Sequence, residues 1–138
     1  MNPSRLVSIL ALTLSPSLAA AAVCTPSTTA MCLNHNRFMV EARWTTPDGQ
    51  SGTAHAVKVT EDTGYLWFFN ASNVELVVKV LDGCGIDHRY WVFAGGLTNV
   101  AVELSVSDTE SGDVSNYFSS QNSPFSPIQD TDAFASCP

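Results

Sequence analysis

Basic residues are scarce in this sequence. Its 138 residues include 6 Lys and Arg against 13 Asp and Glu, which gives a formal net charge of −7 at pH 7. Binding to nucleic acid or to anionic lipid depends on clustered Lys and Arg side chains that meet phosphate groups. The composition therefore argues against a nucleic-acid partner, and it is typical of a protein kept in solution by a charged surface.

The sequence also lacks an apolar run long enough to cross a bilayer. The run from Leu6 to Leu18 falls short of the roughly 20 residues that a membrane helix needs. It follows a short cationic stretch ending at Arg5 and precedes the alanines Ala19 to Ala22, an order typical of a secretory signal peptide. We therefore expect a signal peptide at residues 1–22, one mature domain at residues 23–138, and a secreted or periplasmic location without a membrane span.

Four cysteines lie in the expected mature domain. They are Cys24, Cys32, Cys84 and Cys137. Because the compartments outside the cytoplasm are oxidising, we expect two disulfides. Of the three connectivities that four cysteines allow, we favour Cys24 to Cys32, which closes a small terminal loop, and Cys84 to Cys137, which anchors the carboxyl end. In the chain-entropy model each bridge contributes about 2–4 kcal/mol.

Two other uses of the cysteines fit the spacing less well. A zinc site that includes Cys32 and His35 would need further ligands, and the sequence has no paired CxxC motif. Acylation of Cys24, as in a lipoprotein, calls for a small residue before the cysteine and a Leu-like residue at the third position back. Val23 and Ala21 occupy these positions. We therefore expect no metal and no cofactor.

Apolar residues recur at every second position through the mature chain. In Phe38 to Trp44 and in Val74 to Leu81, apolar and polar residues alternate, which is the pattern of a strand with one buried face. Turn signals such as Pro47-Asp48-Gly49 separate these runs from their neighbours. Further strands are expected at Thr53 to Thr60, Tyr65 to Phe69, Tyr90 to Phe93, Val100 to Val106 and Val114 to Phe118.

This pattern predicts an all-β fold without an amphipathic helix. About seven short antiparallel strands form an immunoglobulin-like β-sandwich stapled by disulfides, with a small barrel as the alternative. The segment beyond Ser119 is rich in Ser, Pro and Asp, and we expect a tail there. The tail would be pinned by Phe125, Ile128, Phe134 and Cys137.

No motif in the sequence makes a convincing catalytic site. Asp62-Thr63-Gly64 matches the catalytic triplet of aspartic proteases in sequence. Such proteases place the triplet after an apolar strand and before a small residue, whereas here Glu61 precedes it and Tyr65 follows it, so a β-turn explains it better. No serine lies in a nucleophile-elbow sequence. The segment from Asp108 to Asp113 carries only part of a calcium-loop ligand series, which favours a hairpin loop. The histidines His35, His55 and His88 share no metal-ligand spacing.

Aromatic residues give the strongest hint of a ligand. The runs from Tyr65 to Phe69 and from Tyr90 to Phe93 are apolar on both faces, so the face of each strand that does not enter the core is either covered or exposed. If it is exposed, the candidate ligand-binding residues form a platform, for example with one tryptophan beside the other, that could stack on sugar rings or hold an apolar partner. These candidates are Tyr65, Trp67, Trp91 and Phe93.

Several stretches together carry a resemblance. They are Asn73 to Cys84 (NVELVVKVLDGC), Trp91 to Asn99 (WVFAGGLTN), Asp108-Thr109 with Gly112, and Asp130 to Phe134 (DTDAF). In this combination the sequence resembles an uncharacterised family of small secreted bacterial all-β domains, over nearly the whole mature chain. The resemblance implies export from a bacterium, and it brings no catalytic residue, substrate or cofactor.

The favoured function is a non-catalytic extracellular module that binds a protein or glycan surface. One alternative is a small secreted hydrolase that uses Asp62 or a histidine such as His55 in a cleft. Another is a structural, envelope-associated module in which the aromatic faces are simply buried. The hydrolase is disfavoured if Asp62 is a turn residue with no histidine or carboxylate nearby. A contiguous exposed patch of the four aromatic residues favours binding, and its absence favours a structural module.

Overall fold

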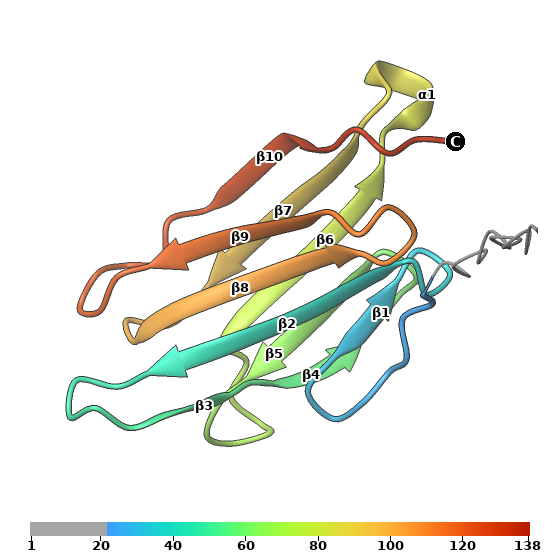
Figure 1. Cartoon of the computed structure of the whole chain (residues 1–138). Coiled ribbons are helices and arrows are strands. Elements are labelled where there is room, and N and C mark those ends of the chain that lie inside the picture. The colour runs from blue at the N-terminus through green and yellow to red at the C-terminus, as the bar shows by residue number, and fades with distance from the viewer. Residues whose placement is uncertain (1–21) are drawn as a thin grey trace, which may run out of the picture.

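The computed structural model describes residues 22–138, which form a sandwich of two antiparallel five-stranded sheets (Figure 1). The first sheet has the order β1-β2-β8-β9, with β3 also paired to β2, and the second has the order β10-β7-β6-β5-β4. The predicted all-β, disulfide-stapled sandwich is therefore confirmed. The expected signal peptide at residues 1–22 lies outside the described residues except for residue 22.

The first sheet is built around the long strands β2 and β8, which pair along their whole length. Both β1 and β3 pair with β2 along its other edge, β1 near the beginning and β3 near the end of the strand. The strands of this sheet are β1 (Met31–Leu33), β2 (Phe38–Thr45), β3 (Ser51–Thr53), β8 (Ala101–Asp108) and β9 (Val114–Ser119).

The second sheet has β6 at its centre, between β5 and β7. A short helix, α1 (Cys84–Asp87), joins β6 to β7. Among the described residues, no helix is long and apolar enough to span a membrane. The strands are β4 (His55–Lys58), β5 (Thr63–Trp67), β6 (Leu76–Asp82), β7 (Tyr90–Gly96) and β10 (Ile128–Phe134).

The core lies between the two sheets and follows the period-two pattern of the sequence. In β6 and β8, every second residue is buried and the intervening ones reach the outer face. Burial of a side chain of this size contributes about 1.5–3 kcal/mol, so this apolar layer dominates the stability of the domain. Fully buried side chains from both sheets include Phe38, Val40, Leu66, Leu76, Val78, Val80, Val92, Leu104 and Val106.

The described residues contain ten strands rather than about seven, because β1 and β10 were not expected and one expected strand is divided into β3 and β4. The expected strand from Thr53 to Thr60 is divided at the fully buried Ala54, where the chain passes from the first sheet to the second. The amide of Ala54 donates to the carbonyl of Ala42 in β2. The expected tail contains β10, which pairs with β7 at the edge of the second sheet. Its expected anchors pack on the core, with Phe125 and Phe134 buried and Ile128 and Cys137 beside them.

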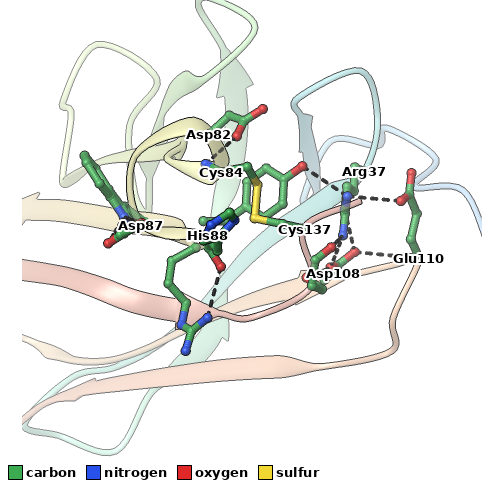
Figure 2. The surroundings of a disulfide bond; sticks show 12 residues. Arg37, Asp82, Cys84, Asp87, His88, Asp108, Glu110 and Cys137 are labelled. Atoms are coloured by element: carbon green, nitrogen blue, oxygen red, sulfur yellow. Dashed lines mark hydrogen bonds and ion pairs between the residues drawn. A yellow bond between two sulfur atoms is a disulfide. The ribbon is translucent and has the colours of Figure 1, made fainter.

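Both disulfides join the expected cysteines, Cys24 to Cys32 and Cys84 to Cys137. The second bridge fixes the segment after β10 to α1, beside a buried ion pair (Figure 2). It therefore anchors the carboxyl end of the described chain to the connection between two central strands.

The ion pair joins Arg37, just before β2, to Asp108 at the end of β8. The Arg37 Nε atom donates to Asp108 Oδ1 at 3.0 Å and Nη2 donates to Oδ2 at 2.8 Å. The Arg37 side chain is 10% exposed and that of Asp108 is 0% exposed. Arg37 also donates to the Tyr90 hydroxyl in β7 and to the carbonyl of Ser136. One guanidinium thus links both sheets to the carboxyl-terminal segment.

The charge of Asp108 is held by several donors. Burial by itself raises the pKa of this carboxyl, but hydrogen bonds from Arg37, from the Ser136 hydroxyl and from the amide of Glu110 outweigh burial and lower the pKa to about 2. The predicted hairpin loop after β8 is present, and Asp108 is the last residue of that strand. Because these hydrogen bonds and the ion pair with Arg37 engage the Asp108 carboxylate, it is not free to be the first ligand of the partial calcium-loop pattern.

Candidate functional site on the outer face of the second sheet

The four candidate aromatic residues all lie on the outer face of the second sheet. Tyr65 and Trp67 come from β5, Trp91 and Phe93 come from β7, and the alternate residues of both strands are buried in the core. Each of the four is half-buried. The period-two pattern therefore places them on a common face, which has β6 along its middle.

The strand register separates the two tryptophans. Leu66, next to Trp67, pairs with Leu76 at the beginning of β6, whereas Trp91 pairs with Leu81 near its end. With a rise of about 3.3 Å per residue, Trp67 and Trp91 are roughly 20 Å apart along the strand direction. The structure does not bring the two indoles side by side, so they do not form the row that the sequence suggested.

Each indole also packs against a neighbour. The His55 ring stacks on Trp67 with a centroid distance of 3.8 Å and an interplanar angle of 10°. The Trp91 Nε1 atom donates to the Asp87 carboxylate at 3.0 Å, and its ring lies so close to Gly83 that a Cβ atom there would be 2.5 Å from it. These contacts occupy ring faces that a flat stacking platform would need.

An open groove of about 460 Å³ lies near the centre of this face. Such a volume falls within the range of small-molecule sites. Its lining is mostly apolar, and Val77 in its wall has 46% of its surface exposed. The lining consists of Thr63, Val77, Lys79, Leu81, Phe93, Ala94, Gly95, Pro127, Ile128 and Gln129. Of the four predicted residues, Phe93 alone belongs to this lining, and we call the feature the β6–β7 groove.

A row of four residues crosses the groove at right angles to the strands. Thr63 pairs with Lys79, Lys79 with Phe93, and Phe93 with Gln129. These residues come from β5, β6, β7 and β10, so the row spans most of the sheet. It places one ammonium group beside an aromatic ring, with a hydroxyl and an amide at its ends.

Gly95 keeps the groove open beside this row. It pairs with Val77, and a Cβ atom added to Gly95 would meet no atom within 4 Å. The space above the glycine is therefore free, and the groove is bounded on the β10 side by Pro127 and Ile128. Without a side chain at residue 95, a ligand could approach the backbone of β7 closely.

The outer face of the first sheet is different in character. Its central strands present charged and hydroxyl side chains, among them Glu41 and Arg43 from β2 and Glu103 and Ser105 from β8. Arg43 pairs across the strands with Glu103. The central strands of this face are polar, and its exposed apolar residues, Val114 and Phe118, lie on the edge strand β9. The apolar groove belongs to the second sheet.

Asp62 lies in the turn before β5 with its carboxylate engaged by hydroxyls. Thr63 and Thr60 donate to Oδ1 at 2.7 Å and 2.8 Å. These hydrogen bonds, first that of Thr63 and then that of Thr60, hold the pKa of Asp62 below its usual range, and the positive charge of Lys79 adds to the effect. Within residues 22–138 no hydrogen bond joins Asp62 to a histidine. This is the setting of a turn carboxylate, as the β-turn interpretation expects.

The three histidines lie in separate places. His35 and His88 occupy left-handed turn positions, with φ angles of 57° and 60°, and His55 stacks on Trp67. Across the described part of the chain, no group of three or more His, Cys, Asp or Glu side chains is arranged to hold a metal ion.

Sequence reasoning missed the residues at the centre of the groove. The alternating pattern assigns Val77 and Lys79 to the outer face of their strand, but it does not mark either as a site residue. Gly95 has the sequence signature of a strand end, whereas β7 continues through Gly96. The available signal was Lys79 itself, a cation within the most apolar segment of an acidic protein.

Comparison of the chain with protein-family models, with curated proteins and with solved structures finds no match. The function must therefore be argued from the geometry and chemistry of the site.

Proposed function

We propose that this protein is an exported, non-catalytic binding module and that the outer face of its second sheet is the recognition surface. The observation that carries the proposal is the apolar β6–β7 groove, with Val77 46% exposed in its wall. Exposed apolar surface costs free energy in water, and concave apolar surface with a few polar groups is typical of binding sites. The central strands of the first sheet present polar side chains instead, which supports this choice of face.

Export is part of the proposal. The two disulfides, Cys24 to Cys32 and Cys84 to Cys137, suit an oxidising compartment. The amino-terminal pattern of a cationic stretch, an apolar run and small residues supports a cleaved leader. Mass spectrometry of the protein recovered outside the cytoplasm should find an amino terminus at residue 22 or 23, and an intact Met1 would contradict this part.

The recognition surface is tested by a charge placed at its centre. Val77→Glu introduces a carboxylate into the groove wall, and Val114→Glu is the matched control because Val114 is 52% exposed on β9 of the first sheet. Purified wild type and both variants are immobilised and exposed to culture medium, to cell-envelope extract from the source organism and to a glycan array. Circular dichroism and thermal melting confirm that each variant is folded.

We expect wild type and Val114→Glu to retain the same partner and Val77→Glu to lose it, because a buried unpaired charge opposes binding. If Val77→Glu keeps every partner of the wild type, the recognition surface lies elsewhere. If the wild type retains no protein or glycan above an unrelated β-sandwich control, the binding function itself is contradicted.

A further inference from the structure

We propose that the β6–β7 groove binds a small amphiphilic carboxylate, with its apolar tail over Gly95 and Val77 and its carboxylate at Lys79. This inference rests on the proposed binding function and names the ligand class of the same site. It is carried by the combination of a mostly apolar groove and an ammonium group without an acidic partner.

The charge argument begins with the distribution of basic side chains. Arg37 pairs with Asp108 and Glu110, Lys58 pairs with Glu61, and Arg89 pairs with Asp132. Within residues 22–138, Lys79 and Arg43 have neither an ion pair nor a side-chain hydrogen bond. Arg43 lies on the first sheet, paired in register with Glu103, whereas Lys79 lies in the groove.

Asp62 is the acidic group whose pKa responds to Lys79, but its Oδ1 atom already accepts hydrogen bonds from two threonine hydroxyls. The protein carries a net charge of −7, but the groove lining contains Lys79 and no Asp or Glu. An anionic group in the ligand would complete the electrostatics of this site.

The apolar lining determines which kind of tail the anionic group carries. Val77 and Leu81 flank Lys79 along β6, and the space above Gly95 extends from the ammonium row toward Pro127. Each methylene buried in such a place contributes about 0.8 kcal/mol. The lining therefore favours an acyl or aryl tail over a hydroxyl-rich molecule. Neither tryptophan lines the groove, which also argues against a stacked sugar.

The polar residues of the row limit the headgroup. Lys79 offers three N–H donors and Gln129 offers an amide, whereas the hydroxyl of Thr63 already donates to Asp62. A single carboxylate matches one ammonium in charge, and its second oxygen can accept from a neutral donor. A cationic headgroup would be repelled by Lys79. A nucleic acid would need further basic residues, and Lys79 alone supplies a positive charge to this lining.

The test uses a charge series of one chain length. Octanoate, octanol and octylammonium are titrated below their aggregation concentrations into the purified, disulfide-bonded protein. Binding is followed by backbone amide shifts in two-dimensional NMR and by isothermal titration calorimetry. We expect octanoate to bind about tenfold more tightly than octanol, as a charge-assisted hydrogen bond at a partly desolvated site provides, and octylammonium to bind most weakly. The amide shifts should cluster in β6, β7 and the 127–129 segment.

Two variants separate the charge from the tail. Lys79→Met keeps an apolar stem and removes the ammonium, so it should abolish the tenfold preference for octanoate and leave octanol binding unchanged. Lys58→Met is its control, because that lysine is paired with Glu61 outside the groove. Gly95→Val places its Cβ atom where no other atom lies within 4 Å, and it should weaken octanoate and octanol alike by tenfold or more while the domain stays folded. Gly85→Ala, also free of clashes, is its control.

The inference is overturned if octanoate causes no shifts at the groove, or if Lys79→Met leaves the ratio of octanoate to octanol affinity unchanged. It is also overturned if sedimentation shows a dimer that Gly95→Val dissociates, because a second copy would then cover the groove. Loss of partner capture by Val77→Glu without any binding of octanoate would leave the proposed function standing and remove only the ligand class. Failure of both experiments would remove both.

Discussion

Replacement of Asp108 by Asn tests whether the buried ion pair with Arg37 holds the two sheets and the carboxyl-terminal segment together. The substitution keeps the shape of the side chain and removes its charge, which leaves the guanidinium of Arg37 with the solvent-exposed Glu110 as its remaining acidic partner. Breaking such a pair by removing one partner costs about 3–5 kcal/mol. We therefore expect a loss of this size in the free energy of unfolding at pH 7.

The pH dependence gives a second and more specific expectation. The pKa of Asp108 falls from an ordinary value of 3.8 to about 2 in the folded protein. A lowered pKa stabilises the folded state above the unfolded-state pKa, and this contribution is lost as the pH falls through the folded-state pKa. At about 1.4 kcal/mol per pH unit, the contribution is about 2 kcal/mol. It should be complete above about pH 5 and disappear between about pH 4 and pH 2.

The assay is urea denaturation followed by tryptophan fluorescence, with wild type and Asp108→Asn compared at a series of pH values from 7 to 2. The difference between their free energies of unfolding should be constant down to about pH 5 and then shrink by about 2 kcal/mol. Asp132→Asn, which removes a solvent-exposed partner of Arg89, should change stability by less than about 1 kcal/mol. A difference that stays constant down to pH 2 would refute the assignment of a lowered pKa to Asp108.

Three further outcomes are expected from contacts across the fold. In the chain-entropy model, the Cys84–Cys137 bridge, with a sequence separation of 53, contributes about 4 kcal/mol, and the Cys24–Cys32 bridge, with a separation of 8, contributes about 2.5 kcal/mol. Paired replacement by alanine should therefore lower the urea midpoint more for the long bridge, and the reverse order would contradict the model. Tyr117→Phe removes a hydroxyl that donates at 2.8 Å to a carboxylate on β10, so it should cost about 1 kcal/mol in the same assay. Because burial and then this carboxylate raise the pKa of Tyr117, wild type and Tyr117→Phe should show equal phenolate absorbance at pH 11.

Much of the sandwich could be predicted because local pattern and burial agree. The alternation in β6 and β8 assigns each side chain to the core or to the surface, and the structure follows it. The strand within the tail was not predicted because β10 is an edge strand with a polar sequence, in which Asp132 remains exposed. β10 pairs with β7 through backbone hydrogen bonds to a strand distant in sequence, and such bonds cannot be predicted from the amino-acid composition of the tail.

The site could be predicted in part for the same reason. Period two places Trp67 and Trp91 on outer faces, but the register of three strands decides how far apart they lie. The groove needs Gly95 from β7 and Pro127 from the tail to bound one space. Segments distant in sequence form this groove together, so a local sequence pattern could not predict it.

The hydrogen bond from Arg37 to the carbonyl of Ser136 spans 99 residues, and it sets an order of events during biosynthesis. A chain made from its amino terminus presents Arg37 and Cys84 long before Ser136 and Cys137 emerge. The two sheets can be linked meanwhile through Arg37, Asp108 and Tyr90, but β10 and the segment after it cannot be fixed until Ser136 and Cys137 are available. Full resistance to proteases and to reduction should thus be acquired late, after residue 137 is free to fold.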